Sequence, residues 1–301
     1  MPRTRTVRRI WAMRHAYGFI APFYLLFLVF GAFPLGWSLF LSFQDWDGLK
    51  AMKYVGLRNF TRLLRDQRFL DALANTTVYW IVDTIFILGL AILMAILLNT
   101  QRLSGKRFYR MVLFLPNVTA TVAIGLVFSM VFDYNSGLLN WILQTFGIQR
   151  LAWMNSTGLS KIPVMVLTIW RNIPWFMLII LSGLQAINPE LYQAATVDGA
   201  GPAQKLFHIT IPSLSTVLFF CFLTETIDSF RLFTEPYILT SGGPGSSSLA
   251  IVQYLYESGF TTFKLGYASA MGYVLTALLL IISAAQVISL RRGGSEIGNA
   301  A

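Results

Sequence analysis

The sequence has 301 residues, of which 55% are hydrophobic and only 12% carry a charge. Soluble domains carry about 25% charged residues, and a soluble chain of this length needs a far larger polar surface. A water-soluble globular protein is therefore excluded. The mean hydropathy of +0.62 indicates a protein whose surface lies largely in lipid.

The charged, cysteine and histidine residues exclude further classes of protein. A single cysteine, Cys221, cannot form an internal disulfide, and two histidines far apart in the sequence make no metal site. The net charge of +10 first suggests a nucleic-acid partner. Because the arginines flank apolar runs rather than cover a polar domain, a lipid bilayer is the expected partner, and nucleic acid is not.

Several apolar runs are long enough to cross a bilayer as helices, because one span needs about 20 mostly apolar residues. Backbone groups in lipid must form hydrogen bonds within their own segment, and the runs lack the alternating polarity of barrel strands. The six runs cover residues 18–42, 73–98, 111–132, 162–184, 211–230 and 267–290. The predicted fold is an all-α membrane protein with six transmembrane helices.

Basic residues outside the runs predict the topology and the division of the chain. The N-terminal tail contains Arg3, Arg5, Arg8, Arg9 and Arg14. This tail and the compact basic loop at 99–110 favour cytoplasmic N- and C-termini. The predicted parts are a cytoplasmic basic tail at 1–16, the first span with an outer segment at 17–72, a transmembrane domain at 73–290 and a cytoplasmic tail at 291–301.

Residues 55–73 contain the densest group of basic residues that oppose this topology, Arg58, Arg62, Arg65 and Arg68. Leucine and phenylalanine recur there at helical spacing, while the arginines point elsewhere, which predicts one amphipathic helix. Such a helix lies either at the membrane interface or against its own bundle.

The polar loop at 188–212 has a regular pattern that predicts a helix, a turn and a second helix. Asn188 and Pro189 are typical of a helix start, and Glu190 suits the first turn. Gly199, with the Gly201–Pro202 pair, permits a turn before the second helix. The small residues between them leave room for the close approach of a partner.

This loop resembles that of a known family, the inner-membrane permeases of binding-protein-dependent ABC importers. The family loop reads Glu-Ala-Ala, three residues, Gly, nine residues, Ile, any residue, Leu, Pro, and the matching positions here are Gln193, Ala194, Ala195, Gly199, Ile209, Ile211 and Pro212. Gln193 replaces the usual Glu and Ile211 the usual Leu, so a salt bridge of the family's acid is not carried over. The resemblance implies an ATPase-coupling loop formed by Gln193, Ala194, Ala195, Asp198, Gly199 and Ala200.

The resemblance covers nearly the whole chain and is strongest with carbohydrate permeases of the maltose and glycerol-phosphate group. Its further motifs are Val55-Gly-Leu-Arg-Asn-Phe60, Leu115-Pro116, Thr240-Ser-Gly-Gly-Pro-Gly245 and Gly266-Tyr-Ala-Ser-Ala-Met271. It implies the type I ABC importer permease fold in a bacterial or archaeal inner membrane. It also implies a second homologous permease subunit, two cytoplasmic nucleotide-binding ATPase subunits and an extracytoplasmic solute-binding protein.

The glycine-rich stretch 241–245 lacks the Gly-Lys-Ser/Thr ending of a nucleotide loop, so a tight turn is expected there. ATP and magnesium are therefore expected on the partner ATPase, with no cofactor, metal or catalytic residue on this chain. A membrane enzyme would need a cluster of catalytic residues, and the sequence contains no such cluster. A secondary transporter would show inverted repeats in its two halves, and the sequence shows no such symmetry.

Charged residues within spans are costly, about 2.5 to 3.5 kcal/mol each, and lie by default in the bundle interior or in a wet cavity. The candidates are Asp83, Arg171, Glu225 and Asp228. In one interpretation Arg171 forms a buried structural ion pair with one of the three acids. In the other, some of the four residues line a solute path.

The spacing of Glu225, Asp228 and Ser229 places them on one helix face. In similar sugar permeases this stretch faces the substrate cavity, and the fourth span contributes residues corresponding to Trp170, Asn172 and Trp175. Rings can stack on a sugar's apolar face while amides and acids bind its hydroxyls. The expected function is half of the translocation path for an oligosaccharide or disaccharide, with glycerol phosphate or another polyol derivative as the alternative.

Overall fold

The computed structural model describes residues 14–100 and 104–298. Within these ranges the chain forms two compact units, one of residues 14–63 with 256–275 and one of residues 64–100 and 104–255 with 276–298. The predicted roles of Arg3, Arg5, Arg8 and Arg9 concern positions outside the described ranges.

The first unit begins with a long apolar helix. Its parts are α2 (Arg14–Phe27), the π-helical turn η1 (Leu28–Ala32) and α3 (Phe33–Ser42). Residues Tyr17–Ser42 are long and apolar enough to cross a membrane, as the sequence predicted for 18–42, and no residue in their most apolar stretch is buried against the rest of the chain. A helix that is apolar on all sides and exposed suits a lipid environment.

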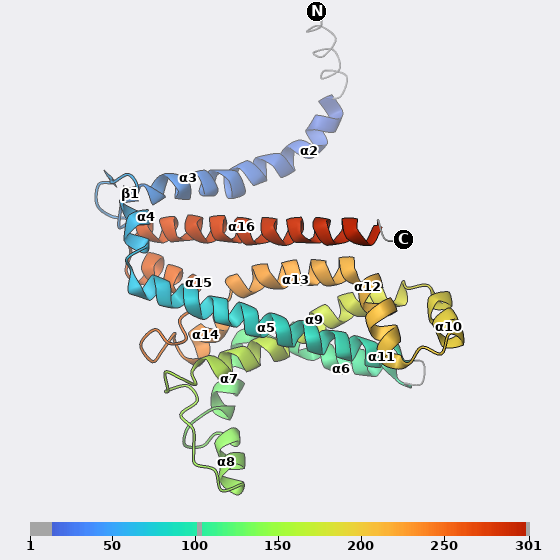
Figure 1. The fold of residues 1–301 in the computed structure, drawn as a ribbon. Coiled ribbons are helices and arrows are strands. Elements are labelled where there is room, and N and C mark those ends of the chain that lie inside the picture. Colours follow the sequence, from blue (N-terminus) through green and yellow to red (C-terminus); the bar gives the residue numbers. More distant parts are fainter. Residues whose placement is uncertain (1–13, 101–103, 299–301) are drawn as a thin grey trace, which may run out of the picture. The chain divides into compact units, whose positions relative to one another are not determined.

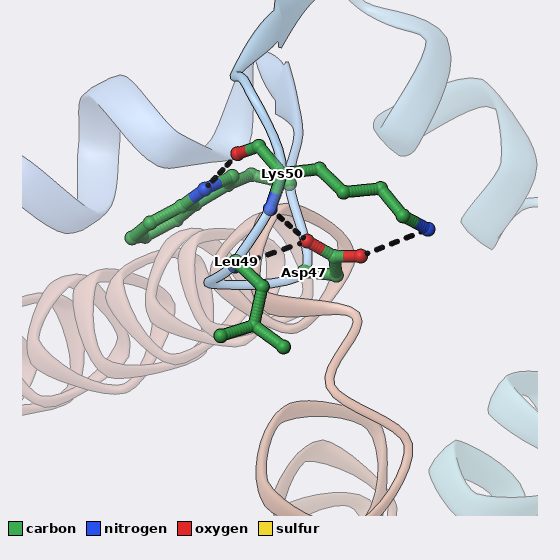
Figure 2. A network of polar contacts seen from close by, with 4 residues as sticks. Asp47, Leu49 and Lys50 are labelled. Atoms are coloured by element: carbon green, nitrogen blue, oxygen red, sulfur yellow. Dashed lines mark hydrogen bonds and ion pairs between the residues drawn. The ribbon is translucent and has the colours of Figure 1, made fainter.

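A small hairpin follows, formed by β1 (Gln44–Asp45) and β2 (Lys53–Tyr54) in antiparallel register. Figure 2 shows how Asp47 closes its loop, with Oδ1 accepting the backbone N–H of Leu49 at 3.1 Å and of Lys50 at 2.9 Å. These bonds to the ionised carboxylate lower the pKa of Asp47 to about 2. The loop is therefore closed by its own polar groups.

Two of the sequence motifs meet beside this hairpin within the first unit. In α4 (Arg58–Leu63), Asn59 donates from Nδ2 to the carbonyl oxygens of Ser42 at 2.9 Å and Gln44 at 2.8 Å. At Gly266, near the start of α16 (Leu265–Gly298), a Cβ would lie only 1.9 Å from the oxygen of Gln44, so only glycine fits. The unit also contains the π-helical turn η3 (Glu257–Thr261).

The prediction of a single amphipathic helix over 55–73 is wrong. α4 ends at Leu63, and α5 begins at Gln67 after Asp66, which adopts an extended backbone. The Asp66 carboxylate accepts the backbone N–H of Arg68 at 3.0 Å and so caps the new helix. This local hydrogen bond starts a second helix where the apolar periodicity predicted continuation.

The second unit contains the remaining helices, and α16 continues into it from the first unit (Figure 1). They are α5 (Gln67–Asn99), α6 (Lys106–Val118), α7 (Thr121–Val131), α8 (Leu138–Thr145), α9 (Lys161–Gln185), α10 (Pro189–Val197), α11 (Pro202–Lys205), η2 (Leu206–Thr210), α12 (Ile211–Ser213), α13 (Ser215–Phe230), α14 (Thr234–Leu239) and α15 (Ile251–Tyr256).

The core of this unit forms where α5 packs along α9. Ala91 and Ala95 of α5 are fully buried against Met177 and Ile180 of α9 and their neighbours. The small alanines, four residues apart, let the two backbones approach closely, a common arrangement between membrane helices. Helices α13 and α14 pack against this pair.

In the described ranges, four helices are long and apolar enough to span a membrane, and six spans result if each of two bent pairs counts as one. The predicted run 111–132 is therefore not one straight helix: α6 and α7 meet at 91°. Between them Thr119 has an extended backbone and Ala120 a non-helical one, shortly after the helix-weakening Pro116. The predicted run 211–230 also contains a break, with a bend of 70° after Ser213.

The segment from Thr240 to Ala250 forms the expected tight turn and is fastened to α5. Asn75 donates from Nδ2 to the oxygens of Ser246 at 2.6 Å and Leu249 at 3.1 Å. The Tyr79 hydroxyl donates to the oxygen of Ser248 at 2.9 Å. A polar backbone segment is thereby satisfied inside the unit.

Candidate functional site

A polar cavity of about 360 Å³ lies between α9, α13 and α14 in the second unit. It is lined by Thr168, Arg171, Asn172, Glu225, Asp228, Ser229, Arg231, Leu232, Phe233, Thr234 and Glu235. Four of the six predicted path residues, Asn172, Glu225, Asp228 and Ser229, are thus brought together. The polar lining contrasts with the apolar helix surfaces of the same unit.

On α13, Glu225 and Ser229 lie one turn apart and are both buried. The Ser229 hydroxyl donates to Oε1 of Glu225 at 3.0 Å. The second carboxyl oxygen, Oε2, has no hydrogen-bond partner within the described ranges. Because a buried acceptor without a partner is costly, Glu225 is suited to accept a hydrogen bond from a ligand in the cavity.

Arg171 of α9 has a partner that the sequence did not suggest. Its Nε lies 3.9 Å from Oε1 of Glu235 and donates to the hydroxyl of Thr121 at 3.1 Å. The sequence had offered Asp83, Glu225 or Asp228 as the partner. Glu235 escaped notice because it follows the apolar run that ends at residue 230.

Glu235 enters the cavity because the helix is interrupted for three residues after α13. The last turn of α13 ends at Phe230, and α14 starts again at Thr234, so Glu235 becomes buried in the same wall as Arg171. The arginine and the acid neutralise each other at the cavity surface. An acid seven residues beyond Asp228, followed by a proline, was the only sequence signal for this position.

The two predicted tryptophans do not belong to the cavity. Trp170 lies against Phe128, with ring centroids 5.5 Å apart, and borders apolar hollows instead. Residues two apart on a helix differ by about 200° around the axis, so Trp170 and Asn172 face opposite directions. Trp175 is 47% exposed and lies outside the lining. The aromatic ring of the cavity belongs to Phe233, which stacks on Tyr237 with centroids 5.2 Å apart.

Asp83 of α5 lies outside the cavity lining but close enough to be influenced by its acids. Its side chain is fully buried, and neither carboxyl oxygen has a hydrogen-bond partner within the described ranges. The charges that act on it are those of Glu225 and Glu235. The interior thus concentrates carboxyl groups around one region of the unit.

The loop at 188–212 forms the predicted helix, turn and second helix. Oδ1 of Asn188 accepts the backbone N–H of Glu190 at 3.0 Å, which confirms the predicted helix cap. Gly199 has φ +76°, a left-handed conformation that favours glycine. The second helix begins at Pro202, where the Gln204 side chain accepts the backbone N–H of Gly201 at 2.8 Å.

α10 lies at one end of the second unit (Figure 1) and contains no buried residue. Val197 is 88% exposed, and Leu191 is 49% exposed. Of the predicted coupling residues, Gln193, Ala194, Asp198 and Gly199 are exposed, while Ala195 and Ala200 are half-buried. The helix therefore presents small and apolar side chains that nothing in the described chain covers.

The chain belongs to the family of binding-protein-dependent transport system inner membrane components, whose family model matches residues 70–292. It is thus a membrane permease component of a transport system that works with a binding protein. The expected family is confirmed, and so is the expected type I importer permease fold.

Individual relatives align over nearly the whole chain. The permease protein AraP of the arabinooligosaccharides transport system of Bacillus subtilis is 36% identical, covering 94% of this chain and 89% of the relative. The lactose transport system permease protein LacF of Rhizobium radiobacter is 31% identical, covering 91% and 93%. A crystal structure of a bacterial alginate ABC transporter in complex with an alginate pentasaccharide-bound periplasmic protein has the same fold, with a TM-score of 0.83, 21% identity and coverage of 95% and 96%.

Proposed function

We propose that this chain forms half of the translocation path of an ATP-driven importer for an oligosaccharide or disaccharide. The observation that carries the proposal is the cavity in which Asn172, Glu225, Asp228 and Ser229 face one another. Carboxylates accept hydrogen bonds from sugar hydroxyls, the amide donates and accepts, and Phe233 offers an apolar ring. The names of AraP and LacF, which refer to arabinooligosaccharides and lactose, support a sugar.

Glycerol phosphate or another anionic polyol derivative is the less favoured solute. Three carboxyl groups line the cavity, from Glu225, Asp228 and Glu235, against the two guanidinium groups of Arg171 and Arg231. Arg171 is already beside Glu235. An anion would therefore face repulsion from the remaining carboxylates, whereas a neutral sugar would not. Membership of a binding-protein-dependent family argues against a secondary transporter.

The proposed partners follow from the exposed α10 and from the family. Two cytoplasmic ATPase subunits would bind ATP and magnesium and contact the loop 193–200, which places α10 and both termini in the cytoplasm. A second homologous permease would complete the path, and an extracytoplasmic binding protein would deliver the sugar. Transport requires that ATP and the loaded binding protein favour one conformation over the other, since a ligand with equal affinity for both shifts nothing.

The cavity is tested with Glu225→Ala and Asp228→Ala in the complete transporter. We expect sugar uptake to fall by at least about tenfold in each variant, because each loses a hydrogen-bonding carboxyl group. Purified binding protein is first screened with lactose, arabinooligosaccharides and glycerol phosphate, and the retained compound is used in the uptake assay. Asp71→Ala is the control, because Asp71 lies outside the cavity lining and accepts a hydrogen bond from Gln67, its neighbour on α5.

Unimpaired uptake in both cavity variants, with normal assembly of the complex, would refute the cavity assignment. Retention of glycerol phosphate but not of sugars by the binding protein would refute the proposed solute class and leave the transporter assignment intact.

A further inference from the structure

Four residues of the loop at 188–212 form a closed ring of hydrogen bonds through their side chains and two backbone oxygens. The hydroxyls of Tyr192 and Thr210 lie 2.9 Å apart. The Thr210 hydroxyl donates to the backbone oxygen of Lys205 at 3.2 Å. Since a threonine has one hydroxyl proton, Tyr192 is the donor in the first bond.

The ring closes through the side chain of the same lysine. Nζ of Lys205 donates to the hydroxyl of Thr196 at 2.8 Å, and that hydroxyl donates to the backbone oxygen of Tyr192 at 2.6 Å. Tyr192 and Thr196 lie one turn apart on α10, and Lys205 and Thr210 belong to the second helix. The ring therefore fastens α10 to the second helix by two side-chain bonds that run in opposite directions.

The ring is attached directly to the span that carries the cavity acids. Thr210 is 6% exposed, and its backbone oxygen accepts the N–H of Leu214 at 3.0 Å, at the bend before α13. Leu214 is 1% exposed, and one of its methyl groups lies 2.8 Å from where a Cβ on Gly183 of α9 would be. A displacement of α10 thus reaches α13 through contacts that are short and tightly packed.

We infer that Tyr192, Thr196, Lys205 and Thr210 are positioning residues that make α10 and the start of α13 move as one body. In their absence α10 would still present its exposed face to the ATPase but could change its angle to the second helix at the Gly199 turn. This inference rests on the proposed coupling function of the loop. The ring of hydrogen bonds would transmit a displacement of α10 to the cavity residues Glu225, Asp228 and Ser229 on α13.

The test measures how accessible a residue at the cavity is, and does not depend on the solute. In a background in which the single cysteine, Cys221, is replaced by alanine, Arg231→Cys provides an exposed thiol at the cavity. The complete transporter with its ATPase subunits is labelled with a maleimide dye, with and without ATP and magnesium. We expect ATP to change the labelling rate at least about fivefold when the ring is intact, a typical coupling factor.

Thr210→Val and Tyr192→Phe remove ring hydroxyls while keeping side-chain volume. We expect both to reduce the ATP-dependent change to less than about twofold while the ATPase subunits remain bound in a pull-down. Thr210→Ser restores a hydroxyl and should restore most of the change. Thr77→Val is the matched control, since the Thr77 hydroxyl donates only within α5, to the oxygen of Leu73 at 2.9 Å.

A full ATP response in both Thr210→Val and Tyr192→Phe would overturn the inference, as would failure of Thr210→Ser to recover it. If Thr210→Val does not fold, Tyr192→Phe decides, because its hydroxyl lies on the more exposed side of the ring. The absence of any ATP response in the chain with the intact ring would refute the proposed coupling function itself, which is a separate outcome.

Discussion

Two glycine turns of the second unit have a similar left-handed φ, but one is crowded by neighbouring side chains and the other is open. Gly242 has φ +80° and Gly199 has φ +76°, both left-handed. A Cβ on Gly242 would lie 2.8 Å from Cδ1 of Leu249 and 3.0 Å from Nε2 of Gln253, both of which are fully buried. A Cβ on Gly199 would meet no atom of the described chain within 4 Å.

The difference separates a turn that is fixed by its own fold from one that is open to another molecule. The turn at Gly242 is enclosed by the chain and by the hydrogen bonds from Asn75 and Tyr79. The turn at Gly199 adjoins the uncovered α10 and has empty space around it. At position 242 internal packing explains the glycine. At position 199 only the left-handed backbone and the proposed partner explain it.

The largest expected effect is that of Gly242→Ala on stability. A left-handed alanine costs about 1 to 2 kcal/mol, and overpacking against Leu249 adds about 1 to 3 kcal/mol. We expect a clearly lower thermal unfolding midpoint in detergent and a lower yield of folded protein. Gly199→Ala is the matched variant, with the same backbone strain and no clash. Equal shifts in the two variants would show that the crowding at Gly242 has no energetic consequence.

Gly199→Asp is expected to affect transport far more than stability. The strain is about 1 to 2 kcal/mol at most, because the site is open, whereas a charged side chain in the proposed contact would uncouple the permease from its ATPase. Uptake and solute-stimulated ATP hydrolysis are measured together with retention of the ATPase subunits. Survival of all three would refute the role of this turn.

Gly199→Asn separates the two causes, because asparagine adopts the left-handed region more readily than other residues. If contact with the partner is what matters, the Gly199→Asn variant is as stable as the parent and still impaired in ATP coupling. If backbone strain alone matters, the asparagine variant behaves like the parent in both measurements.

The features that the sequence predicted well depend on local patterns. The predicted run 162–184 differs from α9 by one residue at each end, and the Asn188 cap forms as expected. Both follow from the apolar content of a segment or from a side chain beside its own backbone. The four cavity residues on α9 and α13 were found because the family pattern aligns with their positions.

The features that the sequence missed depend on contacts between distant segments. The partner of Arg171 is Glu235, which is buried in α14, beyond the interruption that ends α13. Asn75 donates to backbone oxygens more than 170 residues away in the sequence, a contact that no local pattern indicates. Trp170 was assigned to the path by the family resemblance, although its helix face is opposite to that of Asn172. Composition and spacing do not determine such contacts.

The smallest expected effect is on the stability of a third turn, the one that Asp47 closes in the first unit. Asp47 is ionised in the folded state down to a pKa of about 2, because the backbone N–H groups of Lys50 and Leu49 donate to it. Since the folded-state pKa lies below the ordinary value of 3.8, its contribution to stability is complete above that value and is lost as the pH falls from there through about 2. Asp47→Asn should remove this pH dependence.

The measurement is the unfolding midpoint of the parent and of Asp47→Asn in detergent between neutral pH and pH 2. We expect a small difference at neutral pH that shrinks as the pH falls through the acidic range, because the Lys50 side chain is 86% exposed and its ion pair with Asp47 is screened by water. A constant difference at all pH values would mean that the carboxylate charge does not stabilise the turn. A turn closed by its own polar groups should therefore respond to pH, whereas the enclosed turn at Gly242 should respond to the volume of an added side chain.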